Sequence, residues 1–280
     1  MTPAWLAHEP VIRLVCFGGV FAAMAVLEAI RPRRGGTAQR WRRWPSNLGL
    51  VLLNTLVLRL VFPTAAVGVA LAVEASGVGL LPWLGLPMPV AVVAAVVLLD
   101  LAIYLQHVLF HAVPALWRLH RMHHADLDFD VTTGLRFHPV EILLSMVLKL
   151  TMVVALGAPA VAVLVFEVLL NATAMFNHAN LRLPERLDRV LRAVLVTPDM
   201  HRVHHSVVPR ETNSNFGFNL AAWDRLFGTY RAAPMAGHTA MTIGIAQFRD
   251  PHELRLDRML TQPLREGDRA YALGNRAAEP

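Results

Sequence analysis

Long apolar runs separated by short polar segments occupy the first 180 residues of the chain. Three of these runs are about as long as the roughly 20 residues that a helix needs to cross a bilayer, and they cover about 11–30, 48–73 and 90–110. Two shorter runs, 142–156 and 160–176, are joined by Gly157-Ala158-Pro159 and predict a helical hairpin that enters the membrane and returns. The pattern predicts an all-α protein: an integral-membrane helical bundle of about three spans plus a hairpin, capped by a cytosolic helical domain.

Composition supports a membrane location. Hydrophobic residues make up 55% of the chain and charged residues only 16%, whereas a soluble domain carries about 25% charged residues. The mean hydropathy is +0.45, so we expect most of the exterior to face lipid. The one cysteine, Cys16, excludes an intramolecular disulfide and Cys/His zinc-finger spacing. From Arg182 onward the chain is polar enough to form an aqueous domain.

The placement of arginine predicts the orientation. Positive charge marks the cytoplasmic side of a membrane protein, and six arginines lie between the first two apolar runs: Arg31, Arg33, Arg34, Arg40, Arg42 and Arg43. The N-terminus and the connection 74–89, which has no Lys or Arg, would then lie outside. The third run ends in the cytoplasm, and the hairpin and the C-terminus emerge there too. The same placement argues against a nucleic-acid partner, despite the net charge of +6.

Eight histidines fall into three motifs, and the predicted topology puts all three on the cytoplasmic face. Residues i, i+3 and i+4 share one face of a helix, so HxxxH can aim two imidazoles at one ion. HxxHH can aim two rings at one metal while the third ring reaches a neighbouring one. Eight imidazoles suit two metals of four or five ligands each. The motifs are His107 with His111, then His120, His123 and His124, and finally His201, His204 and His205.

Two further histidines, His138 in FHP and His178 in NHAN, could complete the set. Imidazole binds Zn, Cu, Fe and Ni, so the ligand type does not name the metal. A membrane zinc hydrolase is one alternative, but such sites use three protein ligands and a general base. A metal transport or storage protein is another, although its histidines would follow a path across the bilayer rather than gather at one end.

Polar residues within the apolar runs are candidates to orient the ligands. Metal-bound histidine generally donates its outer N–H to a carboxylate or carbonyl. Asp100 shares a helical face with His107, and Glu167 shares one with His178. Asn177 directly precedes His178 and is a third candidate. The alternative for the two acids is an ion pair with Arg59 or Lys149.

These ordered motifs resemble the fatty acid hydroxylase / sterol desaturase superfamily of integral-membrane, histidine-box di-iron oxygenases. The resemblance runs from about residue 90 to 230 and covers DLAIYLQHVLFH (100–111), WRLHRMHH (117–124), FHPVE (137–141), NHAN (177–180), TPDMHRVHHS (197–206) and NFGFNLAAWDRLFGTY (215–230). It implies N-terminal membrane helices over 1–90, a catalytic region over 91–230 and a cytosolic C-terminal tail over 231–280.

The resemblance also implies two irons per chain, O2 as co-substrate and a lipid substrate taken from the bilayer, which is hydroxylated, desaturated or cleaved. The eight motif histidines are the implied ligands, with His138 and His178 matching additional histidines of the superfamily.

The sequence contains neither a Gly-rich dinucleotide fingerprint nor a CxxCH haem site. A separate electron donor of the ferredoxin or cytochrome b5 type is therefore predicted. Arginines could dock an acidic donor, or could reflect the ordinary positive charge of a cytoplasmic face: Arg118, Arg121, Arg202 and Arg210.

Overall fold

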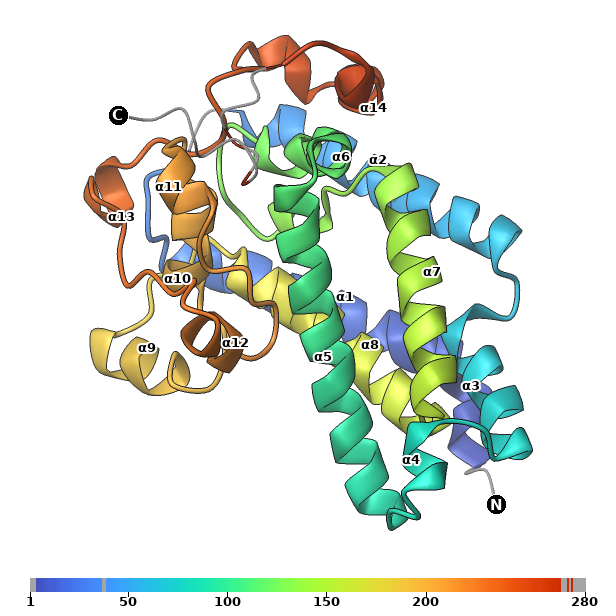
Figure 1. Ribbon diagram of the computed structural model, residues 1–280. Coiled ribbons are helices and arrows are strands. Elements are labelled where there is room, and N and C mark those ends of the chain that lie inside the picture. Colours follow the sequence, from blue (N-terminus) through green and yellow to red (C-terminus); the bar gives the residue numbers. More distant parts are fainter. Residues whose placement is uncertain (1–3, 37–38, 268–270, 272, 274–280) are drawn as a thin grey trace.

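The computed structural model describes residues 4–36, 39–267, 271 and 273, and within them the fold is helical (Figure 1). Extended chains pair only at isolated bridges among these residues. The helices are η1 Ala4–His8, α1 Glu9–Ile30, α2 Arg40–Val61, α3 Ala65–Ser76, α4 Leu80–Trp83, α5 Met88–Ala112, α6 Pro114–His124, η2 Thr133–Leu135, α7 Pro139–Leu156, α8 Ala160–Asn177, α9 Glu185–Leu191, α10 Pro198–His204, α11 Pro209–Thr212, α12 Ala222–Leu226, α13 Gly237–Ala240, η3 Pro251–Leu254, α14 Leu256–Thr261 and η4 Gln262–Leu264. The all-α prediction is confirmed.

Within the described ranges, five segments are long and apolar enough to cross a membrane, and they correspond to the three predicted spans and the two arms of the hairpin. With a rise of 1.5 Å per residue, the 25 residues of α5 extend about 37 Å, which exceeds the roughly 30 Å of a hydrocarbon core. The two arms α7 and α8 have 18 residues each. Gly157 ends α7 in a left-handed conformation, and Pro159 precedes α8, so the predicted hairpin is present.

The pattern predicts one continuous helix over the second apolar run, and this prediction is wrong. The run divides into α2 and α3, with Pro63 in the break. Proline has no backbone N–H and its ring clashes with the preceding turn, so it interrupts a helix. Ala65, the first residue of α3, has a positive φ of 51° and completes the bend. The helix α2 also begins earlier than predicted, at Arg40, and so includes part of the basic segment.

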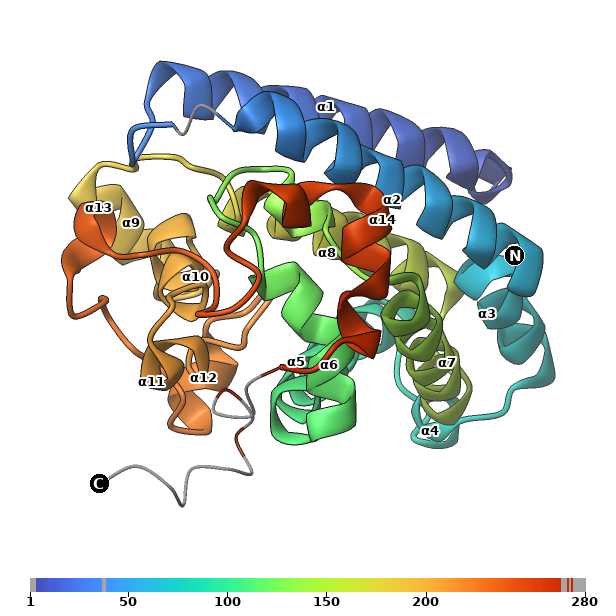
Figure 2. The ribbon, with the colours of Figure 1, turned by 90° about the horizontal axis from the view of Figure 1, so that it is seen from above.

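The long helices pack into a bundle (Figures 1 and 2). The helix α8 contacts α1, α3 and α5, and α7 contacts α2, α3 and α5. Aromatic residues of α1 meet the start of α2, where Phe21 lies edge-on to Trp44 at 5.7 Å between ring centroids. The short helices α9 to α13 gather beside the C-terminal end of α5, and α14 packs on α2. The three segments of the predicted domain division therefore contact one another.

Arginines of the basic segment form ion pairs with acidic residues of the loop after α6 and of α10. Arg43 is fully buried, and its guanidinium donates to Asp126 at 2.6 and 2.7 Å and to Asp130 at 2.6 Å. Burial alone would raise the pKa of Asp126, but the guanidinium holds it at about 2. Arg33 pairs with Asp199 at 3.0 Å. The start of α2 is thereby bound to the loop that follows α6. Residues 274–280, which are predicted to be cytoplasmic, lie outside the described residues.

We predict that Arg43→Met destabilises the protein by about 3–5 kcal/mol, because it leaves buried carboxylates without their partner. Thermal unfolding in detergent should show the loss. Arg42→Met is the matched control, since Arg42 is the exposed neighbour and stacks on Trp41. Equal melting temperatures for the two variants would contradict the anchoring role of Arg43.

Candidate metal centre

The histidines of the first two motifs meet because the chain reverses direction between α5 and α6. Val113 is extended and Pro114 is the first residue of α6, a position where its missing N–H costs nothing. The last turns of α5 carry His107 and His111, and α6 packs back against them with its own histidines. Nε2 of His107 lies 3.0 Å from Nε2 of His120, thirteen residues later.

The third motif is positioned by a capped helix. The hydroxyl of Thr197 accepts a hydrogen bond from the Met200 N–H, and Pro198 follows as the first helical residue of α10. This N-cap and proline pair starts the helix at a defined residue. The seven residues of α10 then present His201 and His204, and His205 ends it. The helix contacts α8, which brings His178 to the same place.

Nine histidines form two buried groups, in each of which one nitrogen per ring lies within 4.8 Å of all the others. All nine side chains are at most 3% exposed. In both groups Nε2 atoms face one another, and neighbouring pairs among eight of the nine rings lie 3.0–3.2 Å apart. The first group holds His107, His111, His120, His124 and His204, and the second holds His123, His178, His201 and His205.

Each HxxHH motif is divided between the two groups. In α6 the i, i+4 pair His120 and His124 belongs to the first group, while His123 turns to the second. The third motif is divided in the opposite sense, because its i, i+4 pair joins the second group and only His204 joins the first. The groups are in contact, since the rings of His124 and His205 stack with 4.6 Å between centroids. The spacing therefore builds two adjacent sites from shared helices.

Outward hydrogen bonds fix the tautomer of several rings. The Nδ1 atoms of His107, His204 and His178 lie 2.7 Å from the backbone carbonyls of Phe216, Ser214 and Ala174 respectively. A carbonyl oxygen only accepts, so each of these Nδ1 atoms carries the proton. The Nε2 atom of each ring is then a bare lone pair that points at the other lone pairs of its group.

Two side chains complete this outer layer in the first group. Oε1 of Glu141 accepts from Nδ1 of His120 at 2.7 Å. Oδ1 of Asn213 accepts from Nδ1 of His111 at 3.1 Å, and its amide group is oriented by donating to the carbonyl of Tyr271 at 2.9 Å. Such partners fix the ring orientation of a ligand and raise its basicity.

The donor set fits metal ions. Two nitrogens that are each about 2.1 Å from one ion lie roughly 3.0–3.4 Å apart for coordination angles between octahedral and tetrahedral, which matches the spacing of the Nε2 atoms. Lone pairs this close repel one another unless a cation lies between them. Burial also lowers the pKa of His178 to about 3 and holds the pKa of His123 and His204 well below 6.5, so the rings stay neutral and able to bind metal.

His138 is not brought to either group. It caps the start of α7, where its Nδ1 accepts from the Val140 N–H at 3.2 Å, and its Nε2 lies 3.2 Å from the carbonyl of Leu260. Because Nδ1 caps α7 and Nε2 faces α14, both ring nitrogens have partners outside the two groups.

The three polar residues expected to orient the ligands have other partners. Asp100 accepts from the backbone N–H of Leu220 at 3.1 Å and from the indole of Trp223 at 2.9 Å, and so holds the loop before α12. Glu167 forms an ion pair with Lys149 at 2.6 Å, which is the alternative expected for this acid from the sequence. Asn177 donates to the carbonyl of Phe218 at 3.0 Å.

Glu141 and Asn213 were missed by sequence reasoning. Glu141 carries a usable signal, since it is an acid two residues after a proline at the start of a strongly apolar run. Asn213 lies in a loop with no periodicity, and only the fold brings it to His111. Three of the four arginines considered for donor docking are also used structurally. Arg121 and Arg202 are buried, and Arg118 donates to the Pro263 carbonyl at 2.7 Å.

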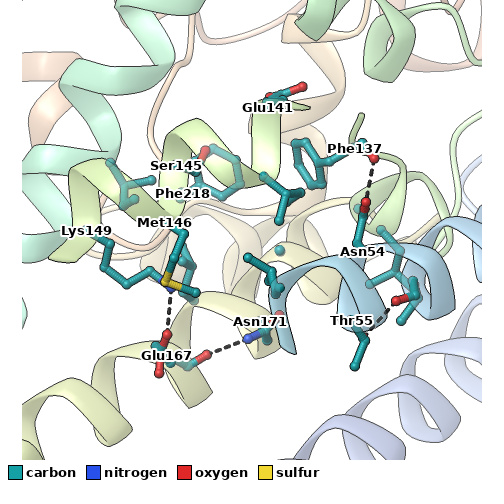
Figure 3. Close-up of a pocket in the computed structure, with 18 of the residues that line it drawn as sticks. Asn54, Thr55, Phe137, Glu141, Ser145, Met146, Lys149, Glu167, Asn171 and Phe218 are labelled. Carbon is teal, nitrogen blue, oxygen red and sulfur yellow. Dashed lines mark hydrogen bonds and ion pairs between the residues drawn. The ribbon is translucent and has the colours of Figure 1, made fainter. Parts of the chain in front are cut away.

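A cavity of about 410 Å³ reaches the first group from within the bundle (Figure 3). Its wall at the metal end includes His107, His120 and Glu141, with Phe137 and Phe218 beside them. The remaining wall comes from α1, α2, α5, α7 and α8. The first histidine group therefore borders a space between the membrane-spanning helices.

Comparison with known proteins agrees with this arrangement. An ornithine lipid hydroxylase of Rhizobium tropici is 27% identical over 255 residues, which are 87% of this chain and 75% of that protein. Alkylglycerol monooxygenases of Xenopus tropicalis and Homo sapiens are 31% and 27% identical over 136 and 157 residues. These two matches span 28% and 32% of the monooxygenases. No solved structure matches the chain.

The match to a family model covers residues 92–229 and carries the description fatty acid hydroxylase. This segment contains all nine histidines of the two groups and the acid that touches His120. The chain belongs to the fatty acid hydroxylase superfamily, as the motifs had indicated.

Proposed function

We propose that this protein is a membrane-bound, non-haem di-iron oxygenase that hydroxylates or desaturates a C–H bond of a lipid with O2. The observation that carries the proposal is the pair of buried, neutral, all-imidazole groups, the first of which borders a cavity between membrane helices. Its similarity to a lipid hydroxylase and to alkylglycerol monooxygenases supports the same reaction class.

Two bound irons would supply the oxidising power that no side chain has, because removal of hydrogen from an unactivated C–H bond exceeds acid–base chemistry. The chain's own residues bind, orient and exclude water. The Nε2 atoms of nine histidines hold the metals, and Glu141 and Asn213 fix the rings of His120 and His111. Phe137 and Phe218 keep the metal end of the cavity apolar.

The lipid would enter the cavity from the bilayer, since the cavity is lined by the membrane-spanning helices. Electrons would come from a separate ferredoxin- or cytochrome b5-type protein. We place the metal centre on the cytoplasmic face, with the N-terminus outside and the C-terminus in the cytoplasm. The asymmetry of arginine around the first two spans supports this orientation. Nine imidazoles exceed the three ligands typical of a zinc hydrolase.

We predict that the purified protein binds about two irons per chain, because each group offers a full set of donors. His204→Ala should lower the iron content and abolish oxygenation, since it removes a nitrogen from the first group. His138→Ala is the matched control and should retain iron, because His138 lies outside both groups. Elemental analysis with lipid mass spectrometry decides: one zinc and no iron, or full activity of His204→Ala, would contradict the assignment.

We predict that Glu141→Gln keeps the fold but weakens metal binding or activity by roughly 10- to 100-fold, as is typical for partners of metal-bound histidine. The amide cannot reproduce the charge that supports the Nδ1–H of His120. Metal retention against a chelator measures the effect independently of turnover. Glu185→Gln, at an exposed position on α9, is the control. Equal retention by both variants would show that Glu141 has no positioning role.

The orientation can be tested with alkaline phosphatase, which folds actively only outside the cytoplasm. We predict an inactive fusion after Pro280 and an active fusion after Gly77, in the connection that lacks Lys and Arg. The opposite pattern would overturn the proposed placement of the metal centre.

A further inference from the structure

The far end of the cavity carries a cluster of charged side chains that has no part in the metal groups. In Figure 3 the wall runs from Glu141, at the metal end, to Lys149 and Glu167 at the other. Along α7 the residues Glu141, Ser145 and Lys149 are spaced four apart and all line the cavity. Eight residues of helix separate the two ends by about 12 Å.

Positive charge is in excess at this far end. The carboxylate of Glu167 is bound by Lys149 at 2.6 Å and by Arg13 at 2.5 Å, and Arg13 also pairs with Glu9. Arg59 lines the same space, and within the described part of the chain its guanidinium has neither a hydrogen bond nor an ion pair. Three cations thus face two carboxylates.

The two cations that bind Glu167 are more accessible than its carboxylate. The side chains of Arg13 and Lys149 are 27% and 13% exposed, whereas that of Glu167 is 7% exposed. Arg59 is exposed as well. The Glu167 carboxylate therefore lies behind the two cations that it holds in place. A ligand at this end of the cavity meets the ammonium and guanidinium groups, together with the Glu9 carboxylate, which is 20% exposed and paired with Arg13.

We propose that this end of the cavity binds an anionic group of the substrate, a carboxylate or a phosphate, with Arg59 as the free cation and Lys149 and Arg13 beside it. Ionisable residues within membrane spans are costly and mark functional sites, and guanidinium is suited to both anions. The ligand is then an amphiphile whose hydrocarbon runs along the cavity toward His107 and His120. A carbon about 12 Å from the anionic group would face the first metal group.

This inference rests on the proposed oxygenase function for the reaction, but the binding site can be tested without turnover. Tritiated palmitic acid is bound to the purified full-length protein in detergent and displaced by three unlabelled probes with the same chain: palmitate, hexadecyl phosphate and hexadecanol. The first two carry the anion and the third does not. Wild type should prefer an anionic probe to hexadecanol by at least about tenfold, as expected for a charge-assisted hydrogen bond.

Arg59→Gln should lose most of this preference, and Arg59→Lys should keep most of it. Arg42→Gln removes the same charge from the exposed other end of α2 and should leave the preference unchanged. Tighter displacement by palmitate identifies a free fatty acid as the anion's source, and tighter displacement by hexadecyl phosphate identifies a phosphate headgroup. Both outcomes support the site.

Equal displacement by hexadecanol and the anionic probes would overturn the anion site, as would an unchanged preference in Arg59→Gln. The failure of the oxygenase proposal looks different. In that case the anion preference and its loss in Arg59→Gln are observed, but iron-loaded protein with O2 and a reductant leaves the bound lipid unoxidised. Oxidation of uncharged lipid without any anion preference would support the oxygenase proposal and overturn the anion site.

Discussion

The structure depends on the convergence of nine imidazole lone pairs in a space from which water is excluded. Rings whose Nε2 atoms lie 3.0–3.2 Å apart repel one another, so the arrangement needs positive charge at two points. The chain holds the rings in this state from behind. Backbone carbonyls such as that of Phe216 and the carboxylate of Glu141 accept the outer protons. The helices α5, α6, α8 and α10 are constrained by this requirement, because each contributes rings to a group.

A second set of charges holds the cap against the bundle. Arg43 reaches from the start of α2 to two aspartates in the loop behind α6, and all three side chains are buried. Such an ion pair contributes less to net stability than to the choice of one arrangement, since removal of either partner leaves a buried charge. The loop it orders lies between the second histidine motif and α7, where Glu141 begins the wall of the cavity.

The cavity joins the first metal group to the charged cluster at its far end. Its metal end is apolar around His107 and His120, which suits a hydrocarbon. Its far end presents cations within a membrane-spanning bundle, where an unpaired charge is expensive. A substrate with a charged group and a hydrocarbon chain would satisfy both ends at once. Arg59 is therefore the residue from which the choice of substrate follows in our proposal.

Much of this protein was determined by sequence alone. Twenty-residue apolar runs predict membrane helices because backbone polar groups must be satisfied within the bilayer, and helical periodicity predicts that HxxHH divides between two points. Tertiary structure decided what local periodicity cannot encode. His138 lies between the second and third histidine motifs in the sequence, but in the fold its side chain caps the start of α7. Glu167 shares a face with His178, yet Lys149 lies closer and binds it. Asn213 reaches His111 across 102 residues, a contact that only folding could reveal.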